Sequence, residues 1–241
     1  CFRSVSWTLT FPPAPQPNLI RQGLLQPLFI VFEGADGAGT TTQCRHLCAR
    51  LRLEGHCLVE TREPGGTESG ERIRKLVLDP TLCWLDDVAE LLLYGASRRQ
   101  HVAEVIEPAL RSGKPVISDR YAQSSVAYQG VARGLGTDLV RRVNDLATGG
   151  LAADYTIYLD LKVERALERR RKRDGDRQDR LEQAGLDFQA SVRDAYVNLS
   201  RKDEGNSLLV DADARIEDLA KHVHGTLMAR FPHFPYKTLD I

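Results

Sequence analysis

The sequence predicts an α/β fold in which a five-stranded parallel sheet is flanked by helices on both faces. Two observations support this prediction. Short apolar runs, typical of buried strands, alternate along the chain with longer segments whose apolar residues recur at helical spacing. The first apolar run also leads through a glycine-rich turn directly into such a helical segment. This alternation indicates a parallel sheet whose connecting helices pack on both of its faces.

The expected strands are short and mainly apolar, as strands buried inside a parallel sheet are. In chain order they cover residues 28–32, 57–61, 115–118, 155–159 and 207–210. The expected helices follow where helical periodicity replaces each apolar run. They cover residues 41–53, 85–99, 102–111, 139–147, 164–173, 188–200 and 216–228. Ligands of such a sheet bind beyond the carboxyl ends of its strands, so a site is expected there.

Length and composition favour one folded domain with a sizeable core, although 241 residues leave room for two domains. The proline-rich segment 11–17 cannot hold a helix or a central strand. We therefore expect residues 1–27 to form a flexible N-terminal extension, residues 28–232 to form the folded domain, and residues 233–241 to form a C-terminal tail.

Charge and cysteine usage exclude several classes of protein. The 33 basic and 33 acidic residues balance, so no global basic excess indicates a nucleic-acid partner. No apolar stretch approaches the ~20 residues that a membrane span requires. The five cysteines are scattered and lack a partner pair at the spacing of a metal site. We expect reduced thiols and a cytoplasmic location.

The turn after the first strand carries most of the phosphate-binding P-loop pattern G-x-x-x-x-G-K-[ST]. Gly34, Gly39 and Thr41 stand in register, whereas Thr40 occupies the lysine position. Glycines allow backbone N–H groups to approach an anion, and the N-terminus of the following helix adds partial positive charge. The alternative is a glycine-rich turn that binds nothing. The expected ATP-binding residues are Gly34, Ala35, Asp36, Gly37, Ala38, Gly39, Thr40, Thr41 and Thr42.

Arginine-containing motifs follow the second and third strands. Arg62 begins the segment Arg-Glu-Pro-Gly-Gly, and its guanidinium suits a phosphate monoester. Asp119 and Arg120 follow the third strand, where the carboxylate could stand near Mg²⁺ and the arginine near a transferring phosphate. The alternatives are an ordinary turn with a solvated arginine and a structural salt bridge at the end of the sheet.

A helix pair and a basic segment complete the candidate features. Tyr94 and Arg98 lie four residues apart on one expected helix, so the ring and the guanidinium could hold a planar base or form a surface pair. Residues 169–182 contain seven basic side chains. This segment suits a nucleic-acid patch, a solvated helix face or a mobile lid, but its interspersed acidic residues argue against nucleic acid.

Together these motifs closely resemble the thymidylate kinase family, from about residue 28 to residue 231. These enzymes are P-loop NTPases of the nucleoside monophosphate kinase type, and they transfer a phosphoryl group from ATP to dTMP for dTTP biosynthesis. The resemblance rests on the loop Phe-Glu-Gly-x-Asp-Gly-x-Gly, Arg-Glu-Pro-Gly-Gly, the aromatic-x-x-x-Arg helix, Asp-Arg-Tyr and the lid ending Asp-Arg-Leu-Glu. It implies Mg²⁺ as a cofactor and a homodimer.

The resemblance also implies roles for the acceptor site. Asp36 matches a carboxylate near the acceptor sugar and phosphate, and Arg62 and Arg120 match arginines that hold the dTMP phosphate. Tyr94 matches an aromatic residue that stacks on thymine, and Arg98 matches an arginine that hydrogen-bonds a thymine carbonyl.

Further roles are implied around the base and the metal. Ser125 and Gln129 complete the base contacts, and Tyr128 lies near the sugar. Thr41 and Asp119 are the implied Mg²⁺ ligands. In a lid of about residues 169–182, arginines reach the ATP phosphates. The implied catalytic residues are Asp36, Arg120, Arg173, Arg177 and Arg180.

Thr40 departs from the family pattern because it removes a cation beside the β- and γ-phosphates. Losing such a charge without replacement typically costs several kcal/mol, on the scale of arginine-finger effects. Either other groups supply the charge and the enzyme is active, or the chain is a weak or inactive nucleotide-binding protein. We favour activity, because the other substrate-contacting residue types are all present. A related acceptor such as dUMP stays open, since one methyl group is worth only ~1–3 kcal/mol.

Overall fold

The computed structural model describes residues 27–175 and 179–234. The predicted N-terminal extension up to residue 26, Arg177 and the tail beyond residue 234 lie outside the described residues. None of the described helices combines the length and the apolar character needed to cross a membrane.

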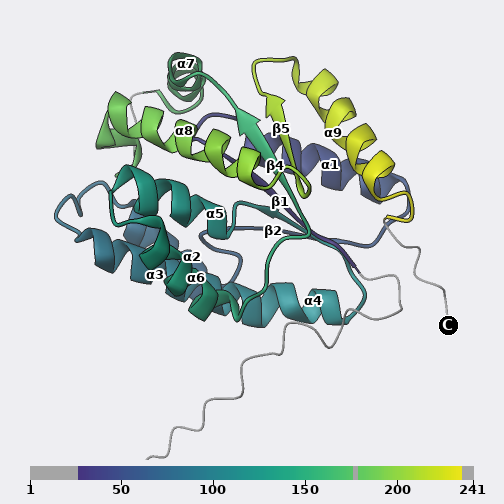
Figure 1. Cartoon of the computed structure of the whole chain (residues 1–241), viewed down its shortest axis with the longest axis horizontal. Helices are drawn as coiled ribbons and strands as arrows, with labels where there is room; N and C mark the ends of the chain where they lie inside the picture. Colours follow the sequence, from purple (N-terminus) through teal and green to yellow (C-terminus); the bar gives the residue numbers. More distant parts are fainter. Residues whose placement is uncertain (1–26, 176–178, 235–241) are drawn as a thin grey trace, which may run out of the picture.

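Five parallel strands form one sheet, in the order β2-β3-β1-β4-β5 (Figure 1). The strands are β1 Phe29–Gly34, β2 Val59–Arg62, β3 Val116–Asp119, β4 Tyr155–Asp160 and β5 Ser207–Asp211. Each lies within two residues of its predicted range. The predicted five-stranded parallel sheet is therefore confirmed, and β1 is its central strand.

Helices cover both faces of the sheet (Figure 1). Most predicted helices are present, but residues 102–111 continue α3 through a π-helical segment instead of forming a separate helix. The helix at Glu68–Leu78 and the helical segment that follows β3 were not predicted. The helices are α1 Thr40–Leu53, α2 Glu68–Leu78, α3 Asp87–His101, α4 Glu107–Arg111, α5 Ala122–Ser125, α6 Thr137–Thr148, α7 Val163–Asp174, α8 Leu186–Lys202 and α9 Ile216–Arg230.

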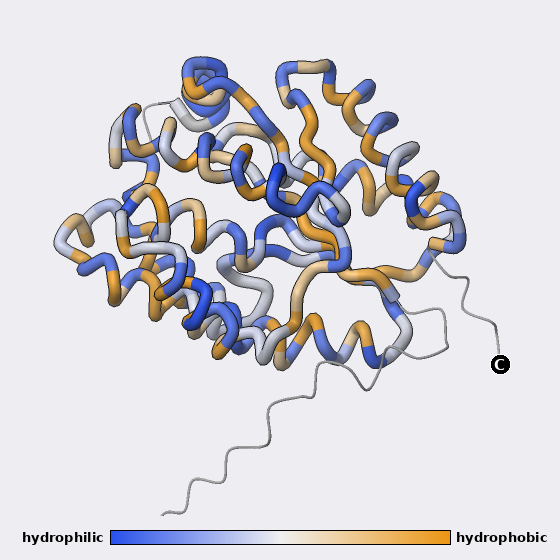
Figure 2. Tube along the Cα trace, in the orientation of Figure 1, coloured by the Kyte–Doolittle hydropathy of each residue, from blue (hydrophilic) through white to orange (hydrophobic). Residues whose placement is uncertain are grey.

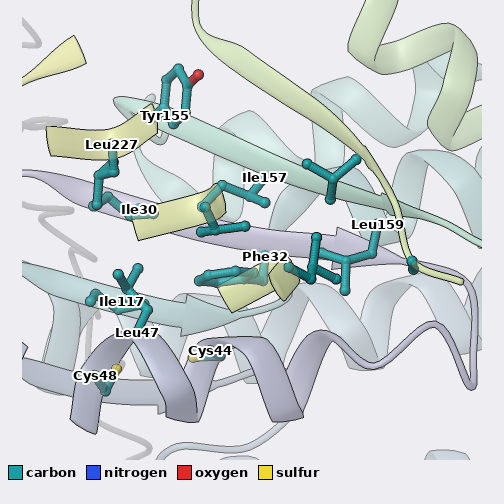
Figure 3. Packing of buried hydrophobic residues seen from close by; sticks show 14 of the residues in the cluster. Ile30, Phe32, Cys44, Leu47, Cys48, Ile117, Tyr155, Ile157, Leu159 and Leu227 are labelled. Carbon is teal, nitrogen blue, oxygen red and sulfur yellow. The ribbon is translucent and has the colours of Figure 1, made fainter. Parts of the chain in front are cut away.

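Alternating residues of β1 point to opposite faces of the sheet. Ile30 and Phe32 pack with side chains of α1 and α9 in the largest apolar cluster, shown in Figure 3. Phe29 and Val31 pack on the other face, against side chains of the α3–α4 region. The hydropathy trace shows the same arrangement, with apolar strands at the centre and polar residues on the outer sides of the helices (Figure 2).

The register of the strands brings three predicted motifs to one edge of the sheet. Phe32 pairs with Asp119, and Asp119 pairs with Arg62 on its other side. The turn after β1, the Arg62 segment and the Asp119 segment therefore all begin at neighbouring carboxyl ends. This edge is the predicted location of the site.

Candidate active site

The turn between β1 and α1 has the geometry of an anion cradle. Gly39 caps α1 with φ 98°, and no side chain hydrogen-bonds the N–H groups of the first helical turn. Such N–H groups bind anions at a helix N-terminus. Gly37 has φ 90°, and a Cβ there would lie 2.6 Å from the carbonyl oxygen of Ala166. Only glycine therefore allows α7 to pack directly against this turn.

Thr40 faces inward at the lysine position. Its side chain is buried, and its Cγ2 lies 3.2 Å from the place where a Cβ on Gly34 would stand. Thr40 therefore fills space beneath the turn and brings no positive charge to it.

The chemistry of Thr41 and Asp119 fits Mg²⁺. The Thr41 hydroxyl donates a hydrogen bond to Oδ2 of Asp119. Oδ1 of Asp119 is buried and has no hydrogen-bond partner within the described residues. A hydroxyl and a carboxylate are hard oxygen ligands, and Mg²⁺ is commonly held by one or two of these together with substrate phosphates and water. The described ranges contain no cluster of three or more His, Cys, Asp or Glu ligands.

A pocket at the carboxyl edge of the sheet gathers most of the predicted acceptor residues. Its wall also includes groups that belong to the lid end, Asp179 and Leu181. The predicted residues that line it are Asp36, Tyr94, Arg98, Arg120, Ser125, Tyr128 and Gln129.

Arg120 occupies the centre of the polar contacts in this pocket. Its Nη2 donates to Oδ1 of Asp36 at 2.7 Å, and its Nη1 donates to the Tyr196 hydroxyl at 3.0 Å. The Tyr128 hydroxyl donates to the other oxygen of Asp36 at 2.8 Å. Arg120 has a φ of 76°, and it is the only non-glycine residue in the described ranges with a positive φ. A backbone conformation of this kind at a site marks a position that the surroundings hold in place.

Arg62 lies in an adjoining cleft, where its Nη2 donates to both carboxylate oxygens of Glu71, at 2.8 and 2.9 Å. Arg74 of α2 lines both this cleft and the acceptor pocket, and its Nη1 donates to the Pro64 carbonyl at 3.0 Å. Burial lowers the pKa of Arg74, and the charges of Arg62 and Arg120 lower it further. Three arginines therefore converge on one space, which favours an anionic ligand there.

Arg74 was not among the predicted residues. The sequence signal that could have located it is the start of α2. Thr67 caps this helix by accepting a hydrogen bond from the Gly70 N–H, and Glu68 and Glu71 lie in its first turn. An N-cap threonine followed by acidic residues marks a helix N-terminus. Recognising α2 in this way would have placed Arg74 one turn beyond Glu71.

Arg98 is buried, and its guanidinium connects several segments that form the walls of the acceptor pocket. Its Nε donates to Glu63 at 2.7 Å, and its Nη1 donates to Ser125 and Asn144. Its Nη2 donates to the Tyr121 carbonyl at 3.0 Å. A guanidinium has five N–H donors, so the four contacts with described residues leave one on Nη2 for a ligand. The surface-pair alternative for Tyr94 and Arg98 is wrong.

The described arginines of the segment predicted as a lid differ in the spaces that they line. Arg173 lines both the cleft at Thr40–Thr42 and a pocket beside Gly37–Gly39. Arg170 lines that second pocket, and its Nε and Nη1 are buried without a hydrogen-bond partner among the described residues. Its Nη1 lies 3.5 Å from Glu182. A buried guanidinium with unused donors favours an anion beside this turn.

Arg180 was predicted to reach the ATP phosphates, but it lines neither the cleft at Thr40–Thr42 nor the pocket beside Gly37–Gly39. Its guanidinium is buried, forms an ion pair with Glu90, and donates from Nε to the Val77 carbonyl at 3.0 Å. These contacts attach the lid end to α2 and α3. Glu90 also accepts a hydrogen bond from the amide nitrogen of Gln129 at 2.5 Å. Gln129 therefore lines the acceptor pocket with its amide nitrogen already paired.

Comparison with known proteins decides the family. The family model described as thymidylate kinase matches residues 32–223. The chain belongs to the thymidylate kinase family. It is 49% identical over 187 residues to the thymidylate kinase of Desulforudis audaxviator, which covers 77% of this chain and 83% of that protein. It is 44% identical over 205 residues to that of Deinococcus radiodurans, covering 85% of this chain and 98% of that protein.

A solved structure agrees with this family membership. The crystal structure of thymidylate kinase from Ehrlichia chaffeensis superposes with a TM-score of 0.69 at 30% sequence identity. The match covers 84% of this chain and all of that chain. The predicted P-loop NTPase fold of the thymidylate kinase type is therefore confirmed.

Proposed function

We propose that this chain transfers the γ-phosphoryl group of ATP to dTMP, giving ADP and dTDP. The observation that carries the proposal is the continuity of the two spaces. Asp36, Arg120 and Asp179 line both the acceptor pocket and the cleft that contains Thr40–Thr42. A phosphate held by Arg120 in the acceptor pocket therefore faces the turn that would hold the phosphates of ATP.

The reaction needs positioning and charge stabilisation more than a strong base. The acceptor phosphate oxygen is already an anion at neutral pH, so no proton has to be removed from it. Arg62, Arg74 and Arg120 would hold that phosphate, and backbone N–H groups of residues 37–41 would hold the donor phosphates. Thr41 and Asp119 would hold Mg²⁺, which neutralises phosphate charge when bound.

The base would lie between Tyr94 and the polar groups opposite it. The Tyr94 ring offers a stacking surface, and the remaining N–H of Arg98 offers one donor to a ring carbonyl. Tyr128, fixed to Asp36, fills the side where a sugar would lie. These contacts suit thymine and tolerate uracil, because the two bases differ by one methyl group.

We assign the charge that Thr40 lacks to the lid arginines, with Arg173 as the catalytic group and Arg170 beside it. Both line the pocket at Gly37–Gly39, and Ala166, Arg170 and Arg173 follow one another at helical spacing on the face that meets this turn. The alternative, an inactive nucleotide-binding protein, rests on Thr40 alone.

An assay of ADP release with dTMP, dUMP and dCMP as acceptors tests the acceptor assignment. We expect kcat/KM to be highest for dTMP and lower for dUMP by about tenfold or more, as one methyl group in a pocket allows. The best performance by dCMP would refute the assignment of the base pocket.

We also propose a homodimer and a cytoplasmic location. Val88 and Leu92 lie one turn apart on α3 and are 43% and 56% exposed, and Leu146 of α6 is 82% exposed. A second copy would cover such apolar side chains. Light scattering should give twice the chain mass, and Leu92→Glu with Leu146→Glu should lower it. The four described cysteines are free thiols, as a reducing compartment requires.

A further inference from the structure

Glu33 is a completely buried carboxylate that the proposed reaction does not use. It stands at the end of β1, where Phe29, Val31 and Glu33 share one face of the sheet. The first two are apolar core residues, whereas Glu33 brings a carboxylate to the same face at 0% exposure. It does not line the acceptor pocket or the adjoining cleft. Burying such a group costs several kcal/mol unless hydrogen bonds compensate it.

Four hydrogen bonds satisfy this carboxylate. Oε1 accepts from the Tyr121 N–H at 2.9 Å and from the Ser124 N–H at 3.2 Å. Oε2 accepts from the Ser124 hydroxyl at 2.6 Å and from the Tyr196 hydroxyl at 3.0 Å. Tyr121 lies in the turn that leads from β3 into α5, and Ser124 lies in α5 itself, so Glu33 ties this turn and the short helix to the central strand.

That turn contains Arg120 in its left-handed conformation. Such a conformation is unfavourable for a non-glycine residue and persists only where neighbouring contacts hold it. The Arg120 N–H donates to the Phe32 carbonyl at 2.8 Å, and the next residue, Tyr121, donates to Glu33. Two successive residues of β1 therefore hold two successive residues of the turn.

The side chains that satisfy Glu33 also touch the guanidinium of Arg120. Nη1 of Arg120 donates to the Tyr196 hydroxyl at 3.0 Å and to the Ser124 hydroxyl at 3.3 Å. A hydroxyl that donates its single proton to Glu33 keeps its oxygen as an acceptor for Arg120, and the two hydroxyls, 2.9 Å apart, complete one connected network. The carboxylate thereby orients both hydroxyls toward accepting from the arginine, while Nη2 is left for Asp36.

We infer that Glu33 is a positioning residue for Arg120: it fixes the turn after β3 and orients the Ser124 and Tyr196 hydroxyls that aim the guanidinium into the acceptor pocket. This inference rests on the proposed function, because Arg120 is assigned there to the dTMP phosphate. Glu33 touches neither substrate, so its effect must reach dTMP binding through Arg120.

Two variants test the inference. Glu33→Gln keeps the shape and one oxygen for the backbone donors, but the amide nitrogen that replaces the other oxygen cannot accept from the two hydroxyls. Glu33→Ala removes all four bonds. We expect KM for dTMP to rise about tenfold in Glu33→Gln, with KM for ATP changed less than about twofold. The dissociation constant for dTMP, measured by calorimetry without ATP, should rise by the same factor.

A matched control separates positioning from stability. The Phe29 N–H donates to Asp154 at 2.8 Å, so Asp154 holds the opposite end of the same strand. Asp154→Asn should lower the melting temperature and leave KM for dTMP unchanged. In an Arg120→Ala background, Glu33→Gln should add less than about a twofold further loss of dTMP affinity, because the group it positions is gone.

Unchanged dTMP affinity in folded Glu33→Gln would overturn the inference, and so would an equal loss for ATP and dTMP. An additive effect in the Arg120→Ala background would overturn it as well. If the wild-type chain binds dTMP but forms no dTDP, the proposed function fails, while the calorimetric comparison still decides the role of Glu33.

Discussion

The hydroxyl of Thr41 donates to Oδ2 of Asp119, and this contact joins the first turn of α1 to the end of β3. The two residues lie 78 positions apart in the chain. Their contact brings a buried carboxylate oxygen, which has no hydrogen-bond partner among the described residues, to the mouth of the anion cradle. Both substrates would meet at this point.

Thr41→Ala should raise the Mg²⁺ concentration needed for half-maximal activity and lower kcat by about 10²-fold, on the scale of losing one charge-stabilising group. Thr41→Ser keeps the hydroxyl and should retain most of the activity. A titration of initial rate against Mg²⁺ measures both variants. An unchanged Mg²⁺ dependence in Thr41→Ala would argue against this residue as a ligand.

Arg173→Ala should lower kcat by about 10²- to 10³-fold, because it removes the cation that we assign to the transferring phosphate. Arg171 is exposed on the same helix and lines none of the pockets beside the turn. Arg171→Ala is therefore the matched control and should change kcat less than about twofold. Equal losses in the two variants would indicate a general charge effect.

Thr40→Lys should change kcat little or lower it, because a lysine would compete with the lid arginines for the same phosphate oxygens. Steady-state kinetics of the variant and the wild type decide this. A large rise in kcat from a wild-type value near zero would support the inactive nucleotide-binding protein instead.

Arg180→Ala should destabilise the fold by about 1–3 kcal/mol, because it removes the closer of the two arginines paired with the buried Glu90 and leaves only Arg133, at 3.3 Å. Chemical denaturation of the variant and the wild type measures this loss in the free energy of unfolding. The exposed pair of Arg72 and Glu68 provides the control, and Arg72→Ala should cost less than about 1 kcal/mol. A stable Arg180→Ala variant with a selective loss of kcat would restore the phosphate role.

Stability should fall as pH rises from about 5 to 8, in part through Glu33. Burial raises the pKa of Glu33 from 4.5 to about 7, against the opposing effects of Arg120 and of its hydrogen bonds. Between these values the folded state binds more protons than the unfolded state, so the free energy of unfolding decreases with increasing pH. The decrease attributable to Glu33 is on the order of 3 kcal/mol.

Denaturation of wild type and Glu33→Gln at pH 5 and pH 8 isolates this contribution. Burial also raises the pKa of Asp179, to about 6, which acts in the same direction in both proteins. The variant should therefore lose less stability than the wild type over this interval. Parallel curves for the two proteins would show that Glu33 does not titrate there.

The fold could be predicted because its strands are local sequence signals. The apolar run before Gly34 and the turn after it predict a buried strand and a helix start within about 15 residues, without reference to other segments of the chain. The motifs at 62 and 119 then meet because parallel strands share one carboxyl edge. The roles inside the acceptor pocket, in contrast, were implied by the resemblance to the family.

Roles that depend on packing could not be predicted. The spacing of Tyr94 and Arg98 placed them on one face, but only the folded chain shows that Arg98 is buried against Glu63, Ser125 and Asn144. Arg180 carries the same charge as Arg173, and only the folded chain shows that it is buried against Glu90. The role of Glu33 could not be predicted because its hydrogen-bond partners come from distant segments.

Formation of dTDP from ATP and dTMP by the unaltered chain tests the central claim most directly. With Mg²⁺ present, we predict that chromatography of the products will show one dTDP for each ADP, at a rate well above ATP hydrolysis without dTMP. Binding of dTMP without formation of dTDP would contradict the claim that this chain is active with threonine at the lysine position.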